Sequence, residues 1–255
     1  MHHAPIPCTT RPPSRPRAAV PLLLGGWLLA FGLSSTIATW ILFTGTTETL
    51  PKPLAAALPV TVVTAFAVAA AQLAAAVALL RLSPAELGLA RPRPLPGGWP
   101  GAAALGYAAA WTGFQFLGLF PSPDGAYGAP QSSGWELVWN LNAALVEETV
   151  LFALPLAVMA RRGLTWPVQL AVLVVLRLPH HMYYGLGATV TVAVWMAGWL
   201  YVYRRTGAIW PLMLAHLAYN SAHAAYLPPA AGALLGLTTL AFAAVTALRW
   251  ARPKS

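Results

Sequence analysis

The stretch LVEETVLFALP, residues 145–155, decides how this chain folds, because it places two adjacent carboxylates in an otherwise apolar run. An ionised side chain at the centre of a membrane helix costs roughly 2.5–3.5 kcal/mol on insertion scales. Glu147 and Glu148 are therefore expected to face other polar groups or water inside a helical bundle. Adjacent residues of an α-helix point about 100° apart, so the two carboxylates are expected to have different partners.

The composition of the whole chain indicates a polytopic membrane protein. Of its 255 residues, 58% are hydrophobic and only 8% are charged, whereas soluble domains carry roughly 25% charged residues. The formal charge of +9 would suggest nucleic acid or acidic lipid as the partner of a soluble protein. Here the basic residues lie in short loops between apolar runs, so membrane topology explains them and no nucleic-acid partner is expected. The single cysteine, Cys8, excludes an intramolecular disulfide and a cysteine-based metal cluster.

The apolar runs predict about eight membrane helices, since one span needs about 20 mainly apolar residues. The runs are 19–44, 54–80, 99–120, 135–160, 164–183, 187–203, 207–226 and 230–249. The expected fold is an all-α, polytopic membrane helix bundle over residues 19–250. Residues 1–18 are rich in proline and arginine and lack apolar periodicity, so they are expected to form a disordered, basic cytoplasmic tail.

The distribution of basic residues supports this topology. If both termini are cytoplasmic, all of the 15 Lys and Arg residues except Lys52 and Arg177 lie in inside segments. Lys52 is then outside, and Arg177 falls within a span. This asymmetry is what the positive-inside rule predicts for eight spans. The expected location is an integral, multi-pass position in a bacterial-type cell membrane, with the lipid bilayer as a partner.

Strongly polar side chains at membrane depth gather in the second half of the chain. Besides the two glutamates they are Arg177, His180, His181, His216, Asn220 and His223. His216 and Asn220 are four residues apart and share one helix face. His180 and His223 fit the ordinary role of hydrogen-bond partners between helices, with His180 placed toward the outer interface. The whole set, distributed over three spans, indicates one shared site.

The residue types in this set suit the activation of water. The chain has no GxSxG motif, and its only aspartate, Asp124, lies in a loop. A partly buried glutamate is a good general base, an imidazole can shuttle a proton, and imidazole and amide groups can stabilise an oxyanion. The predicted reaction is hydrolysis of a carbonyl substrate, most simply a peptide bond. Glutamate with two histidines is also a catalytic zinc set, although HExxH is absent, and both mechanisms stay open.

Three short motifs in order strengthen this interpretation. They are EETVLF (147–152), RLPHH (177–181) and HLAYN (216–220), and RRTGAIWPLMLAHLAYNSA (204–222) leads into the third. Over residues 135–225 the chain resembles the CAAX proteases and bacteriocin-processing enzymes, the CPBP or Abi intramembrane proteases. That family carries EExxxR, FxxxH and HxxxN on an eight-helix-like scaffold. The expected catalytic core of this chain is 135–226.

The resemblance implies a role for each matching residue. Glu147 would activate water with assistance from His181, and His216 and Asn220 would line the oxyanion site. If the reaction depends on a divalent metal such as zinc, Glu147, His181 and His216 would be the ligands; otherwise no cofactor is assigned. The choice of Glu147 over Glu148 rests on the resemblance alone.

Two positions depart from the family pattern in a reciprocal way. Phe152 replaces the arginine of the first motif, and Arg177 replaces the phenylalanine of the second. The hypothesis is that the two positions face each other, so that Arg177 neutralises Glu148 and Phe152 fills the space of the missing ring. Without such an exchange, Glu148 or Arg177 would be an unpaired charge at membrane depth.

The predicted function is therefore that of an intramembrane endopeptidase that cleaves membrane-associated protein or peptide substrates. A membrane-anchored or bacteriocin-like peptide is expected rather than a prenylated CAAX protein. The alternative is a non-catalytic membrane immunity or scaffold protein on the same fold. A proton-coupled transporter is less favoured, because no inverted repeat is visible. The sequence does not predict the oligomeric state.

Overall fold

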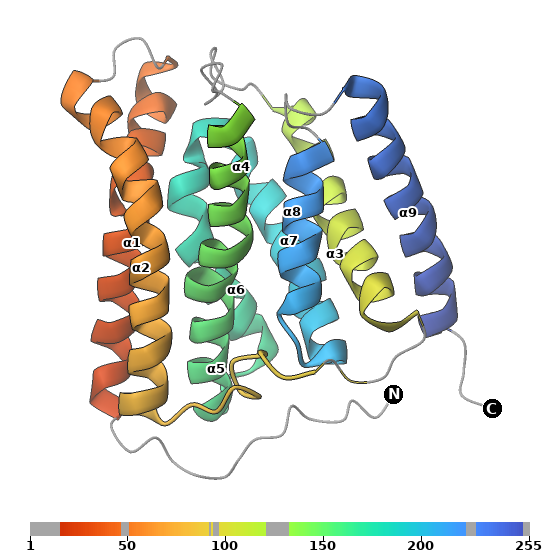
Figure 1. Ribbon diagram of the computed structural model, residues 1–255, viewed down its shortest axis with the longest axis horizontal. Helices are drawn as coiled ribbons and strands as arrows, with labels where there is room; N and C mark the ends of the chain where they lie inside the picture. Colours follow the sequence, from red (N-terminus) through yellow and green to blue (C-terminus); the bar gives the residue numbers. More distant parts are fainter. Residues whose placement is uncertain are drawn as a thin grey trace.

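The computed structural model describes residues 16–46, 51–91, 93, 97–120, 133–222 and 228–251. Every regular element among these residues is helical, which agrees with the predicted all-α class (Figure 1). Residues 1–15 of the expected tail lie outside the described residues, and 16–18 belong to the first helix. The helices are α1 (Pro16–Thr44), α2 (Lys52–Leu80), α3 (Gly98–Gln115), α4 (Ser133–Asn142), α5 (Leu154–Arg161), α6 (Trp166–His181), α7 (Gly187–Thr206), α8 (Trp210–Ala222) and α9 (Pro229–Ala251).

Four helical segments are long and apolar enough to cross a membrane. They are Ala18–Thr44, Lys52–Leu80, Gly134–Arg161 and Pro229–Ala251. The apolar faces of the outer helices are exposed, as a lipid-facing surface requires; Leu29, Phe43 and Leu237 are examples. These segments support a multi-pass membrane protein, while the number of eight spans and the cytoplasmic termini stay predictions.

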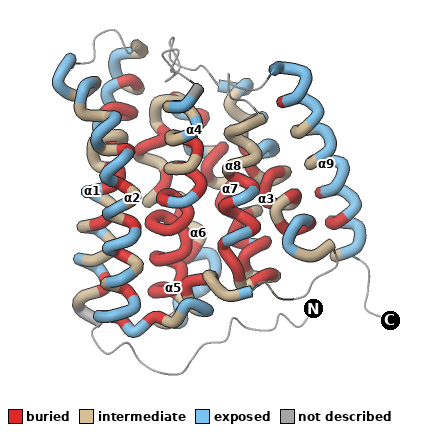
Figure 2. Tube along the Cα trace, in the orientation of Figure 1, coloured by how far each residue is buried: buried red, intermediate tan, exposed pale blue. Residues whose placement is uncertain are grey.

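The segment from α4 to α5 is the centre of the bundle. Of its most apolar window 89% is buried, against 22–28% for the other three long segments, and Figure 2 shows the buried residues gathered in this middle region. The pair α1 and α2 lies at one edge of the bundle and α9 at the other (Figure 1). Polar groups placed on α4–α5 are therefore shielded on both sides.

The central segment changes its hydrogen bonding where the two glutamates lie. Residues Ala143–Ala153 form a π-helix between α4 and α5, and the Leu154 amide donates to the carbonyl of Thr149, five residues back. Pro155 follows directly and has no N–H to donate to the preceding turn, which accounts for the change of register at this point. Single π turns inside α-helices are frequent at functional sites.

Side-chain hydrogen bonds to backbone carbonyls join the helices around the site. Trp27 of α1 donates to the carbonyl of Leu176 on α6 at 2.8 Å, and Asn142 of α4 donates to that of Val62 on α2 at 2.9 Å. These bonds fix the position of α1 along α6 and the position of α2 along α4. These four helices surround the cavity described below.

A salt bridge holds the loop that follows α2 against the end of α5. Arg161 donates to Glu86 Oε2 at 2.8 Å and to the carbonyls of Leu80 and Arg81 at 2.6 and 2.7 Å. Burial raises the pKa of Glu86, but hydrogen bonds from Arg161 and Ser83 outweigh it and lower that pKa to about 2. Glu86 therefore stays ionised over the physiological pH range.

Candidate active site

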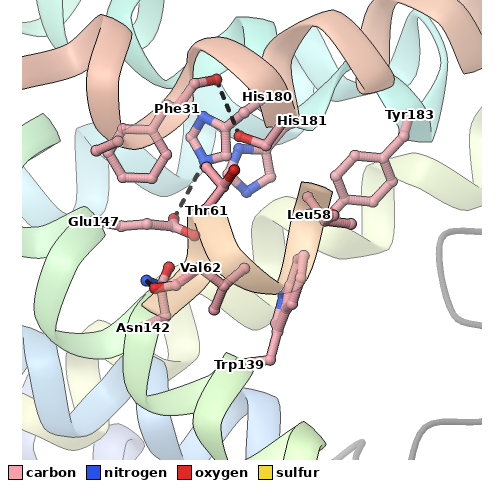
Figure 3. A pocket seen from close by; sticks show the side chains of 12 residues that line it. Phe31, Leu58, Thr61, Val62, Trp139, Asn142, Glu147, His180, His181 and Tyr183 are labelled. Carbon is pink, nitrogen blue, oxygen red and sulfur yellow. Dashed lines mark hydrogen bonds and ion pairs between the residues drawn. The ribbon is translucent and has the colours of Figure 1, made fainter. Parts of the chain in front are cut away.

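Glu147 is a buried carboxylate with a histidine beside it. Its residue is 8% exposed, and its Oε2 lies 3.4 Å from Nε2 of His180 (Figure 3). Nη2 of Arg177 lies 3.8 Å from the same oxygen. No hydrogen bond is formed by this oxygen among the described residues, so it keeps a lone pair for a water molecule or another ligand.

The last turn of α6 brings both His180 and His181 to Glu147. Nδ1 of His181 lies 3.1 Å from the backbone carbonyl of Arg177. Because a carbonyl can only accept, this Nδ1 carries the proton, and Nε2 of a neutral His181 is left as an acceptor. One ligand atom from each of Glu147, His180 and His181 lies within 4.8 Å of the others.

His180 corrects one expectation from the sequence. It was expected to be a hydrogen-bond partner between helices toward the outer interface, but it is only 7% exposed and stacks against Phe31 of α1 with 5.0 Å between ring centroids. Pro179 precedes it, and the helix ends at His181. A helix that ends inside the bundle turns two consecutive residues inward. The end of α6 is therefore the feature from which the position of His180 beside Glu147 could have been predicted.

A cavity extends from these three residues between α1, α2, α4 and α6. Its volume is about 50 Å³, and its other lining residues include Leu58, Thr61, Val62, Trp139 and Tyr183 (Figure 3). Polar and apolar side chains line it in similar measure, and Thr61, Asn142 and Tyr183 are polar residues there besides Glu147, His180 and His181. The cavity therefore brings the glutamate and the two histidines together beside apolar side chains.

Glu148 is not among the residues that line this cavity, and it binds Arg177 and His216. Both it and Arg177 are 0% exposed, and Nη2 of Arg177 donates to Glu148 Oε1 at 2.6 Å. Nδ1 of His216 lies 2.8 Å from the same oxygen. The ion pair between Arg177 and Glu148 that the sequence predicts is thus present, and the same Nη2 lies 3.8 Å from Glu147, so that Arg177 is shared by the two glutamates.

Phe152 and Arg177 meet at a shared tryptophan. The Phe152 ring packs edge-on against Trp199 and Tyr203, with centroids 6.3 and 5.6 Å apart. The Arg177 guanidinium lies over Trp195 at 4.5 Å and over Trp199 at 5.3 Å. Ring and charge therefore lie against the same indole from two different helices, as the exchange hypothesis requires.

Of the third motif, His216 lies within reach of both glutamates, since one ligand atom of each of the three residues lies within 4.8 Å of the others. His216 is buried and bound to Glu148 through Nδ1, which leaves its Nε2 as the nitrogen available to another group. Asn220 is half-buried one turn along α8 and is not among the residues that line the cavity. His223 lies outside the described residues.

Two overlapping sets of side chains could hold a metal ion. Glu147 with His180 and His181 is one, and Glu147 with Glu148 and His216 is the other. In the second set Arg177 already neutralises Glu148 and would repel a divalent cation. The first set has a carboxylate oxygen and both His180 nitrogens buried without hydrogen bonds within the described structure, and its donors suit zinc. The set predicted from the sequence, with His216 in place of His180, is not one of the two.

Comparison with known proteins agrees with the sequence motifs. The family described as Type II CAAX prenyl endopeptidase Rce1-like matches residues 131–222, which contain all three motifs. Among curated proteins and among solved structures, no significant match to this chain was found.

Proposed function

Residues 131–222 belong to the CPBP, or Abi, family, and from this premise we propose that the protein is an intramembrane endopeptidase. Its substrate would be a membrane-associated protein or peptide, with a membrane-anchored or bacteriocin-like peptide proposed rather than a prenylated CAAX protein. One observation carries the proposal: the free carboxylate oxygen of Glu147 and the two histidines of α6 converge on one cavity.

Glu147 is the proposed general base. Its Oε2 takes a proton from a water molecule, whose oxygen attacks the carbonyl carbon of the scissile bond to give a tetrahedral oxyanion. The same carboxyl then returns the proton to the amide nitrogen, the C–N bond breaks, and a carboxylic acid and an amine are released. A positioned carboxylate contributes typically 10²–10⁴-fold to such a step.

His181 and His180, whose ring centroids lie 4.1 Å apart, orient the water beside the glutamate. With its Nδ1–H donated to a backbone carbonyl, His181 offers Nε2 as the acceptor for the second water proton. Nε2 of His180 lies 3.4 Å from the glutamate oxygen and helps to hold that carboxylate in position. Asn220 does not line the cavity, so its role as a donor to the oxyanion stays a prediction.

His216 is proposed as a positioning residue. Through its bond to Glu148 it completes a network with Arg177 that sets the orientation of the central helix. Because Glu147 is the next residue in that helix, loss of the network would misplace its carboxylate. A misplacement of about 1 Å can cost on the order of 10²-fold in rate.

If the enzyme uses a metal, Glu147, His180 and His181 are the proposed ligands. A bound zinc would supply Lewis-acid polarisation of the carbonyl and a lowered pKa for its water. Incubation with a strong chelator, followed by readdition of zinc, separates the two mechanisms: loss and recovery of activity support the metal, and full activity in chelator supports the glutamate alone.

The test of the function uses purified protein in liposomes with a membrane-anchored, internally quenched peptide. Glu147→Gln and His181→Ala are each expected to reduce cleavage by about 10²–10⁴-fold while the midpoint of thermal unfolding stays near that of the wild type. Glu136→Gln, at the start of α4, is the matched control and should keep full activity. If all three variants cleave like the wild type, the scaffold alternative replaces the enzyme, and uptake driven by a pH gradient would instead indicate a transporter.

A further inference from the structure

A second, larger cavity lies on the opposite side of the bundle from the candidate active site. It has a volume of about 670 Å³ between α3, α7 and α9, next to the start of α6, and shares no lining residue with the cavity at Glu147. Its walls include Leu105, Ala197, Leu200 and Ala247. The cavity lies where α9 ends, close to the C mark in Figure 1. We call it the α7–α9 groove.

Two arginines and three aromatic residues line the end of this groove. Arg204 and Arg205 come from the last turn of α7, and Trp166, Tyr201 and Trp250 surround them. Tyr201 and Trp166 are 47% and 55% exposed. Tryptophan and tyrosine concentrate at the depth of lipid headgroups in membrane proteins, so the arginines lie at the height where a phosphate would be found.

The Arg205 side chain is held in place by rings and not by a carboxylate. Its guanidinium lies 5.3 Å from the Tyr201 centroid and 5.8 Å from that of Trp250. Its Nε is buried and has no hydrogen-bond partner among the described residues. Of the six acidic residues, Glu86, Glu136, Glu147 and Glu148 are described, and none of them forms an ion pair with Arg204 or Arg205. A buried donor without a partner in a groove indicates a missing acceptor.

We propose that the α7–α9 groove binds one anionic phospholipid. Its phosphate would accept hydrogen bonds from the Arg204 and Arg205 guanidiniums, whose fork geometry matches phosphate oxygens, and an acyl chain would run along the apolar walls toward Leu105. Basic pockets between membrane helices are a recurrent form of headgroup site. This binding site is independent of the proteolytic function, because its residues do not touch those of the candidate active site.

The charges favour a lipid over a second copy of this chain as the occupant. The protein carries a formal charge of +9, so bringing the arginine-rich ends of two copies together would be repulsive. An anionic lipid is available at this depth in the bilayer and neutralises both arginines. The groove also has mainly apolar walls, which an acyl chain would cover and a free phosphate ion would leave uncovered.

The experiment measures lipid retention by native mass spectrometry after transfer from nanodiscs. Wild-type protein from nanodiscs of phosphatidylglycerol is expected to retain one lipid, and protein from phosphatidylcholine nanodiscs to retain at least fivefold less. Arg205→Gln should reduce phosphatidylglycerol retention at least fivefold. Arg249→Gln is the matched control, because Arg249 is an exposed arginine at the same end of α9 that does not line the groove; it should retain lipid like the wild type.

Ala197→Trp tests the acyl-chain half of the site. It fills the groove without removing an arginine and should also lower retention, even if Arg205→Gln fails to fold. Equal retention by wild type and both groove variants overturns the proposal, and so does an equal loss in Arg249→Gln, which would indicate a general surface charge effect. Displacement by inorganic phosphate alone, or a dimer that covers the groove without lipid, also overturns it.

Discussion

Exchange of Phe152 and Arg177 gives the sharpest test of how the central helix is held. Arg177→Phe removes the partner of Glu148, which is 0% exposed and 2.6 Å from the guanidinium. Phe152→Arg puts a second guanidinium into the cluster of Trp199 and Tyr203. The double variant Phe152→Arg with Arg177→Phe restores one ring and one charge against Trp199, with the arginine now four residues from Glu148 on the same helix.

The magnitude follows from the burial of the pair. Removal of one partner of a buried ion pair costs roughly 3–5 kcal/mol, because the other charge is left uncompensated. This corresponds to a factor of about 10² or more in the folding equilibrium. Each single variant is expected to lose about this much stability. If the arginine at 152 reaches Glu148, the double variant recovers most of it, with a coupling free energy near the upper end of about 0.5–3 kcal/mol found for residues in contact.

The assay is a double-mutant cycle on unfolding free energies in detergent micelles, with cleavage of the quenched peptide as a second readout. The control cycle pairs Phe152→Arg with Arg249→Phe, where Arg249 is exposed on α9, and its effects should add. The exchange hypothesis is wrong if the coupling between 152 and 177 is below about 0.5 kcal/mol, or no larger than in the control cycle.

Three further predictions follow from packing, from the loop salt bridge and from the second histidine. A Cβ on Gly113 would lie 2.7 Å from the backbone oxygen of Thr191, so Gly113→Ala should lower the unfolding free energy by about 1–3 kcal/mol. Gly25→Ala is the control, because a Cβ there would have no atom within 4 Å, and it should leave the unfolding free energy unchanged. Equal effects of the two substitutions in thermal unfolding would contradict this packing. Because the pKa of Glu86 falls from 4.5 to about 2, its salt bridge stabilises the fold fully above pH 4.5 and loses this effect as pH falls toward 2. Glu86→Gln should therefore make the unfolding free energy depend less on pH between these two values. An unchanged pH dependence would show that other groups dominate it. His180→Asn should lower kcat, because Nε2 of His180 lies 3.4 Å from Oε2 of Glu147 and helps to position that carboxylate; an unchanged kcat would leave His180 a packing residue.

Much of the fold follows from the sequence because apolar length and charge spacing are local properties. The eight apolar runs coincide with helical segments of the structure, although four of these are shorter or less apolar than a membrane span requires by themselves. The pairing of Glu148 with Arg177 was also predictable, since two opposite charges at membrane depth are far more stable together than apart. The order of the three motifs predicted the family that residues 131–222 match.

The choice of which histidine faces Glu147 was not predictable in the same way. His180 and His181 are adjacent, and both turn toward the glutamate only because α6 ends at His181 inside the bundle. The π-helix at Ala143–Ala153 likewise depends on packing around the centre of the bundle as well as on Pro155. Helical periodicity predicts which residues share a face. The direction in which that face points also depends on whether the segment is an α-helix or a π-helix, which has wider turns.

By itself, then, the sequence determined that this protein is a helical membrane bundle with one cluster of ionisable side chains in its second half. Only the tertiary structure decided that Glu147 faces the cavity, that Glu148 faces Arg177 and His216, and that Arg205 lies in a separate groove. The physical reason is that hydrophobicity and charge set the cost of burying a residue, whereas the neighbour that offsets this cost comes from another helix.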